Sequence, residues 1–117
     1  PFGILQDLTA VSPIHASFEQ LTTVHDPGLV EHIRRVSQQG GGTLDQGDTY
    51  ATDQSYDLAL LAVGGAITSV DHILTGKAKN GFALLRPPGH HAEAKCPVRH
   101  PAITARPLPG HGITSVR

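Results

Sequence analysis

The 117-residue sequence contains no tryptophan and no methionine, and aromatic residues make up only 4% of it. A hydrophobic core must therefore come from Leu, Ile, Val and Ala, within a hydrophobic fraction of 38%. The single cysteine, Cys96, excludes an internal disulfide framework and fits a reducing compartment. The formal net charge is only -1, so no basic surface for nucleic acid or anionic membrane is expected.

Long apolar runs are also missing. No run approaches the roughly 18 residues of a membrane-spanning helix, and no signal peptide is visible. We therefore expect a soluble, cytoplasmic protein with no membrane partner and no direct nucleic-acid partner. The length corresponds to one domain at most, and the sequence leaves the oligomeric state open.

Two short helical signals stand in the first third of the chain. Residues 17–20, Ser-Phe-Glu-Gln, have the spacing of a capping box and predict one helical turn. Asp26 as N-cap and Pro27 at the first helical position predict a second helix, which glycines 40–42 would end. These glycines are not a phosphate-binding loop, because no lysine follows at the required spacing.

Residues 40–54 are rich in Gly, Asp, Gln and Thr and are interpreted as a loop. A longer helix is expected from Ser55 to its natural stop at Gly76. Gly64 and Gly65 each cost this helix about 1 kcal/mol relative to alanine, so a close packing partner is expected there. The apolar stripe of this helix consists of Tyr56, Ala59, Leu60, Val63, Ile67, Val70, Ile73 and Leu74.

The run Phe82-Ala83-Leu84-Leu85 predicts a short buried strand, and residues 86–93 predict the loop that leaves its carboxyl end. Open α/β sheets place their ligand sites at this edge, and the element order favours an α/β fold with a parallel sheet. Two prolines and a glycine support the adjacent His90 and His91, which suggests proton transfer or metal chemistry. The alternative is a structural pair that caps backbone carbonyls.

Residues 82–93 as a whole, Phe-Ala-Leu-Leu-Arg-Pro-Pro-Gly-His-His-Ala-Glu, closely resemble the signature of the zinc-dependent deacetylases. That family includes histone deacetylases, acetylpolyamine amidohydrolases and acetoin-utilisation proteins. The agreement covers roughly residues 17–95 and includes residues 24–26, 47–50 and 55–66. The resemblance implies a truncated α/β deacetylase-type (arginase/deacetylase-like) fold with a parallel sheet.

Two regions follow from this comparison with the family pattern. Residues 1–95 are interpreted as the amino-terminal part of a deacetylase domain. Residues 96–117 contain four prolines and diverge from the pattern, so we expect a poorly ordered tail.

The resemblance implies hydrolysis of acetyl-amide bonds in an acetylated protein or a small acetylated amine, with one bound metal, usually zinc. His91 would be the general base and acid, and His90 its electrostatic partner. Asp48 would accept hydrogen bonds from substrate backbone amides at the rim of the site. The alternative for Asp48 is a turn residue that bonds its own backbone.

The family's metal ligands and its transition-state tyrosine follow the His-His loop, and they have no counterpart in this sequence. No metal ligand is therefore assigned, no zinc is expected to be held by this chain alone, and the chain alone is predicted to be inactive. The competing hypothesis is a truncated or decayed homologue that acts at most as an interaction module. A different metallohydrolase is discouraged by the Arg-Pro-Pro-Gly-His-His string.

The remaining histidines are assigned no function. His25, His32 and His72 fall on or near expected helices, where solvated or partly buried roles are usual. The spacing of Cys96 to His100 and His111 matches no standard zinc finger.

Overall fold

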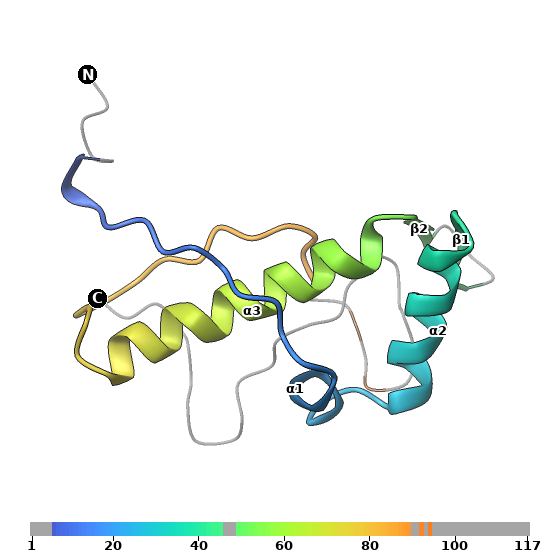
Figure 1. The fold of residues 1–117 in the computed structure, drawn as a ribbon, viewed down its shortest axis with the longest axis horizontal. Helices are drawn as coiled ribbons and strands as arrows, with labels where there is room; N and C mark the ends of the chain where they lie inside the picture. Colours follow the sequence, from blue (N-terminus) through green and yellow to red (C-terminus); the bar gives the residue numbers. More distant parts are fainter. Residues whose placement is uncertain (1–5, 46–48, 90–91, 93, 95–117) are drawn as a thin grey trace.

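The computed structural model describes residues 6–45, 49–89, 92 and 94. Its longest element, the helix α3, runs along the molecule, and the other helices and a small sheet gather near its amino-terminal end (Figure 1). The segments before α1 and after α3 extend back along α3 (Figure 1). The elements in order are α1 (Phe18–Thr22), α2 (Pro27–Gln38), β1 (Gly41–Thr43), β2 (Tyr50–Thr52) and α3 (Ser55–Leu74).

Both short helices begin where the sequence predicted, because polar side chains satisfy their free N–H groups. Ser17 Oγ accepts from the Gln20 N–H at 3.2 Å, and Gln20 Oε1 accepts from the Ser17 N–H at 2.8 Å. At α2, Asp26 Oδ1 accepts from the Gly28 N–H at 2.8 Å, and Pro27 occupies the first turn. Gly40, with φ +96°, follows the end of α2, so the predicted capping box, N-cap and glycine stop are all confirmed.

The predicted loop at residues 40–54 is wrong in part, because β1 and β2 form an antiparallel pair there. Gly42 lies opposite Ala51 in the centre of the pair. A Cβ atom on Gly41 would lie 2.5 Å from the Ala51 carbonyl oxygen, and the φ of Gly41 is +104°, so glycine allows this close pairing. The sequence pattern missed these strands because each has only three residues, and two of the three residues of β1 are glycines, which carry no side chain to show alternation.

The long helix is confirmed as α3, and Gly76, with φ +73°, follows its end. Its glycine pair packs closely, as expected. A Cβ atom on Gly64 would overlap the backbone carbonyl of Ile14, and one on Gly65 would lie 2.9 Å from Leu85 Cδ2. The two extended segments therefore cross α3 at the glycines, where only a hydrogen atom separates helix from chain.

The amino terminus of α3 is capped from α2 rather than by its own N-cap residue. Gln54 makes no side-chain capping bond. Instead, Ser37 Oγ on α2 accepts from the Tyr56 N–H at 3.2 Å, and the Ser37 side chain is buried. This hydroxyl adds a hydrogen bond between the two helices to their apolar contacts in the core.

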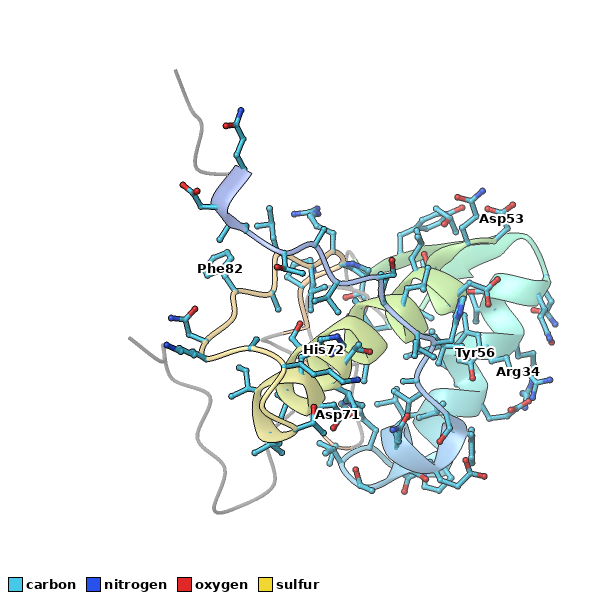
Figure 2. The ribbon with its side chains drawn as sticks, turned by 60° about the vertical axis from the view of Figure 1, so that its left-hand side comes forward. Arg34, Asp53, Tyr56, Asp71, His72 and Phe82 are labelled. Carbon is cyan, nitrogen blue, oxygen red and sulfur yellow. The ribbon has the colours of Figure 1, made fainter. Side chains whose placement is uncertain are left out.

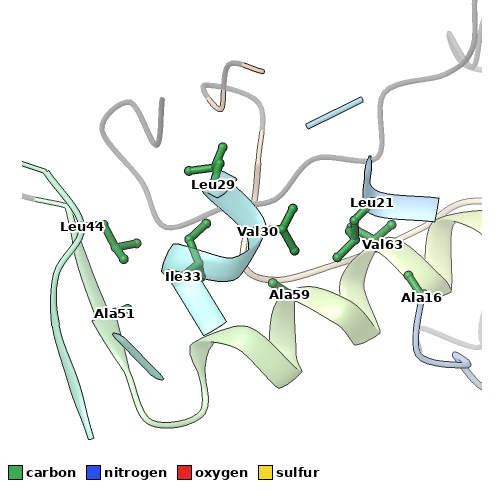
Figure 3. Packing of buried hydrophobic residues seen from close by; sticks show 9 residues of the cluster. All are labelled: Ala16, Leu21, Leu29, Val30, Ile33, Leu44, Ala51, Ala59 and Val63. Atoms are coloured by element: carbon green, nitrogen blue, oxygen red, sulfur yellow. The ribbon is translucent and has the colours of Figure 1, made fainter. Parts of the chain in front are cut away.

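The hydrophobic core lies between α1, α2, the ribbon of β1 and β2, and the first half of α3 (Figure 3). Val30 and Ala51 are fully buried in it, and Leu21 is only 1% exposed. All of its members are Ala, Leu, Val or Ile, as expected for a sequence without tryptophan and methionine. Its members are Ala16, Leu21, Leu29, Val30, Ile33, Leu44, Ala51, Ala59 and Val63.

The expected buried strand at residues 82–85 is wrong. This segment is not a strand, and Phe82 and Leu84 are each 89% exposed. A strand needs a neighbouring strand for its backbone hydrogen bonds, and none pairs with this segment within residues 6–45 and 49–89. The strand pair within these residues, β1 with β2, is antiparallel, so none of the described strands belongs to the expected parallel sheet.

One further expectation needs correction, because α3 is long and apolar enough to cross a membrane by length and composition alone. The sequence showed no uninterrupted apolar run since Asp57, Thr68 and Asp71 lie within the helix. A helix packed on several sides inside a domain has the same composition. In this structure the glycines of α3 and its residues Ala59 and Val63 contact other segments of the domain.

Candidate active site

The predicted site residues Asp48, His90 and His91 lie outside the residues that the structure describes. What the structure does show is how the chain is held on either side of them. Both loops are closed by hydrogen bonds between described residues, and both are attached to the packed core.

The loop that contains Asp48 is closed at its base by Asp45 and Thr49. Asp45 Oδ2 accepts from Thr49 Oγ1 at 2.6 Å, and Asp45 Oδ1 accepts from the Thr49 N–H at 3.3 Å. The backbone closes as well, because the Leu44 N–H donates to the Thr49 carbonyl at 2.8 Å. Thr49 is 1% exposed and Leu44 belongs to the core, so the base of this loop is packed against the core.

The loop that contains His90 and His91 is supported on both sides. The Ala92 N–H donates to the Gly89 carbonyl oxygen at 2.9 Å, which joins the described residues on the two sides of the histidine pair. Beyond it, the Ala94 carbonyl oxygen accepts from the Asp26 N–H at 2.7 Å. Ala94 is thus attached to the N-cap residue of α2.

Sequence reasoning missed this role of Asp26. The residue was recognised as a helix cap from its type and position, and the capping is confirmed. Its second contact joins residues 68 positions apart through two backbone groups (94 − 26 = 68). Backbone groups are the same in every residue, so no sequence signal could have indicated the pair.

The other histidines have separate surroundings. His25 is 2% exposed, directly before Asp26. His32 is exposed on α2, and His72 Nδ1 lies 2.9 Å from the Thr68 carbonyl oxygen within α3. In the part of the chain that the structure describes, no three His, Cys, Asp or Glu side chains gather as a metal site. These residues alone therefore do not fit a bound zinc ion.

Tyr56, at the start of α3, has a pKa that its surroundings change. Burial raises the pKa of Tyr56 above its ordinary value of 10.0, Arg34 acts in the opposite direction, and Glu31 and Asp57 add to the increase. Figure 2 places Tyr56 beside Arg34 and far along the molecule from Phe82. This tyrosine belongs to the contact between α2 and α3 and is not assigned to the candidate site.

Comparison with known proteins identifies the family. The model of the histone deacetylase domain matches residues 2–111 of this chain. The chain belongs to the histone deacetylase family. It is 40% identical over 89 residues to a histone deacetylase-like amidohydrolase of Pseudomonas aeruginosa, covering 76% of this chain and 23% of that protein. It is 38% identical over 96 residues to human polyamine deacetylase HDAC10, covering 78% of this chain and 14% of that protein.

A solved histone deacetylase domain shows the same fold. The crystal structure of the HDA15 HD domain matches with a TM-score of 0.68 and 36% sequence identity, over 74% of this chain and 24% of that chain. The fold is therefore a partial deacetylase fold, as the sequence predicted. The chain spans about a quarter of the length of the Pseudomonas and HDA15 relatives. The boundary expected at residue 95 stays a prediction.

Proposed function

We propose that this chain supplies the proton-transfer part of a zinc-dependent deacetylase that hydrolyses acetyl-amide bonds. The observation that carries the proposal is the family match over residues 2–111, which includes the complete signature from Arg86 to Glu93. Relatives named as amidohydrolase and polyamine deacetylase support an acetylated amine or acetyl-lysine as the substrate class.

In this proposal His91 removes a proton from the attacking water and returns it to the leaving amine nitrogen. His90 stabilises the charge that develops during this transfer, and Asp48 holds the substrate backbone through its carboxylate. Imidazole suits both proton steps because its ordinary pKa of about 6.5 lies close to neutral pH. Because the described residues do not fit zinc, no step through the metal is assigned to them.

Exposed apolar side chains support the proposal that this chain functions as one part of a larger folded domain. Phe82 and Leu84 are each 89% exposed, although Leu85 of the same segment packs on α3. In a complete deacetylase domain, about three quarters of the chain lies outside the part matched here. We propose that this remainder covers Phe82 and Leu84 and converts residues 82–85 into a paired strand.

Two activity measurements test the proposal. The 117-residue chain alone should not deacetylate an acetyl-lysine peptide or acetylspermidine. Fused to the remaining three quarters of the Pseudomonas relative, it should give hydrolysis that a chelator abolishes and that His91→Ala reduces by about 100-fold or more. His32→Ala, an exposed histidine on α2, is the matched control and should keep the fusion active.

The outcomes separate the proposal from its alternatives. A fusion that stays active with His91→Ala would refute the role of His91. Chelator-sensitive turnover by the 117-residue chain alone would refute the proposal that this chain supplies only the proton-transfer part of the enzyme. A monodisperse, folded chain that is inactive in both forms would favour the interaction module.

A further inference from the structure

Residues 9–15 and 81–85 are extended segments that lie on α3 without a strand partner among the described residues. We propose that together they form a docking surface for the part of the deacetylase domain that lies outside the match with this chain. That part adds strands beside both segments and covers the side that faces away from α3. The inference deepens the function proposed above and rests on it, because the occupant is the remainder of the same domain.

The second of these segments runs antiparallel to α3. A Cβ atom on Gly81 would lie 3.6 Å from Ile73 Cδ1, and one on Gly65 would lie 2.9 Å from Leu85 Cδ2. The chain therefore advances by four residues (85 − 81 = 4) while its contact on α3 moves back by eight (73 − 65 = 8). Four residues of a strand span about 13 Å and eight residues of a helix about 12 Å, so this segment is as extended as a β-strand.

The first segment reaches the same part of α3 and runs in the same direction. A Cβ atom on Gly65 would also lie 3.4 Å from Pro13 Cβ, and the Ala16 N–H donates to the Leu60 carbonyl oxygen at 3.0 Å. Figure 1 shows both segments extending along the helix. They are therefore parallel to each other and antiparallel to α3, which is the arrangement of a strand–helix–strand unit in a parallel sheet.

Neither segment has the backbone hydrogen bonds of a strand. Among the described residues, no such bond joins residues 9–15 to residues 81–85, and the pair of β1 with β2 includes neither segment. Residues 9–15 and 81–84 are all exposed. Their backbone groups are thus open edges of the kind to which a further strand adds through main-chain hydrogen bonds.

The side chains of residues 81–85 show which side of the segment needs a cover. Leu85 packs on α3, whereas Phe82 and Leu84 are each 89% exposed. Successive side chains of an extended chain point to opposite sides, so Phe82 and Leu84 face away from the helix. Figure 2 shows Phe82 away from α3. Apolar side chains on both sides are typical of a parallel strand buried between two layers, and among the described residues α3 supplies one of these layers.

The size of the matched relatives indicates what covers this surface. The chain spans 23% of the Pseudomonas amidohydrolase and 24% of the HDA15 domain, so about three quarters of each lies outside the match. In these relatives both parts belong to one chain, so docking is intramolecular and the effective concentration is roughly millimolar. A second copy of this chain at micromolar concentration would compete poorly with it. The remainder of the domain, rather than a second copy, is therefore the occupant.

Hydrogen exchange tests the proposal in two proteins, the chain alone and its fusion to the remaining three quarters of the Pseudomonas relative. In the chain alone, the amides of residues 81–85 should exchange within about tenfold of an unfolded peptide. In the fusion, these amides and those of residues 9–12 should exchange at least about 100-fold more slowly. Val30 and Ile33 of α2, which are 0% and 3% exposed, should be protected in both proteins and report a folded core.

Two lysine substitutions separate the docking surface from the rest of the exterior. Leu84→Lys should leave the urea midpoint of the chain alone unchanged, because Leu84 is exposed there. In the fusion it should accelerate exchange at residues 81–85 at least about tenfold, because docking would bury the ammonium group. Tyr50→Lys, at a 56% exposed position on β2, is the matched control and should change neither quantity.

Each other result overturns the inference. Unchanged exchange of residues 81–85 in a fusion whose α2 amides are protected would show that nothing docks there, and loss of α2 protection in the fusion would contradict docking as well. A chain that is dimeric alone, protected at residues 81–85, and made monomeric by Leu84→Lys would assign the surface to a second copy. Because exchange requires no turnover, an inactive fusion with protected segments would reject the proposed function and keep the docking surface.

Discussion

Two regions of this molecule differ in how their structure is stabilised. The packed region comprises α1, α2, the ribbon of β1 and β2, and the first half of α3, and together with the adjoining Ala16 and Leu44 it contains the whole buried cluster. The open region comprises residues 6–15 and 68–89, where Leu74, Phe82 and Leu84 are 68%, 89% and 89% exposed. The helices of the packed region pack against one another, whereas in the apolar segment 82–85 only Leu85 packs on α3, and Phe82 and Leu84 stay exposed. Apolar composition therefore does not ensure burial here.

The largest difference between the regions should appear on removing apolar side chains. Ile33→Ala should lower the free energy of unfolding by about 2–5 kcal/mol, because Ile33 is 3% exposed in the core. Phe82→Ala, at an 89% exposed position, should change it by no more than about 0.5 kcal/mol. Urea unfolding followed by far-UV circular dichroism measures both, and similar losses would contradict the division into two regions.

The contact between the regions can be tested at the glycine pair. Gly64→Ala would bring a methyl group onto the backbone carbonyl of Ile14, and we expect a loss of about 1–3 kcal/mol. Gly65→Ala meets the movable end of Leu85, at 2.9 Å, and Pro13 Cβ at an ordinary contact distance of 3.4 Å, so a gain in helix propensity of up to about 1 kcal/mol should offset the contacts. The same unfolding measurement compares the two variants. A more stable Gly64→Ala would show that residues 13–16 do not pack on α3.

A smaller effect is expected from the hydroxyl that joins α2 to α3. Ser37→Ala leaves the Tyr56 N–H without its partner and should cost about 1 kcal/mol. Ser69→Ala in the open region is the matched control, because Ser69 Oγ bonds only the Gly65 carbonyl of its own helix, at 2.8 Å. Thermal unfolding should show a lower Tm for Ser37→Ala than for Ser69→Ala. A lower Tm for Ser69→Ala would show that the Ser37 hydrogen bond contributes less to stability than the Ser69 hydrogen bond.

The smallest expected effect concerns pH. Because the pKa of Tyr56 is raised in the folded state, the unfolded chain loses the phenolic proton first as pH rises. Stability should therefore fall between the ordinary pKa of 10.0 and the higher folded value, and it is unaffected by this group below that range. Urea midpoints at about pH 9 and about pH 11 test this. Tyr56→Phe should reduce the decline, and an unchanged decline would assign it to other groups.

Much of the local structure could be predicted from residue types. Ser17 with Gln20, Asp26 with Pro27, and Gly76 determine where the helices begin and end, because their effects act within one helical turn. The glycine pair in α3 likewise predicted a close contact. Which segments make that contact, Ile14 and Leu85, depends on residues far away in the sequence and could not be predicted.

The candidate site divides in the same way. The residues from Arg86 to Glu93 were sufficient to predict the family, which the comparisons confirm, while the roles of Asp48, His90 and His91 remain predictions. The supports of the site were not predictable, because Asp26 and Ala94 meet through backbone groups that carry no sequence information.

Local side-chain chemistry and an ordered motif were enough to set the helix boundaries, the aliphatic core and the family. The folded structure was needed to show that residues 41–43 and 50–52 pair and that residues 82–85 have no strand partner among the described residues. It was also needed to show that the Asp26 N–H, at the cap of α2, bonds the Ala94 carbonyl oxygen. In each case the partner is a backbone group distant in the sequence, and residue type carries no information about which group that is.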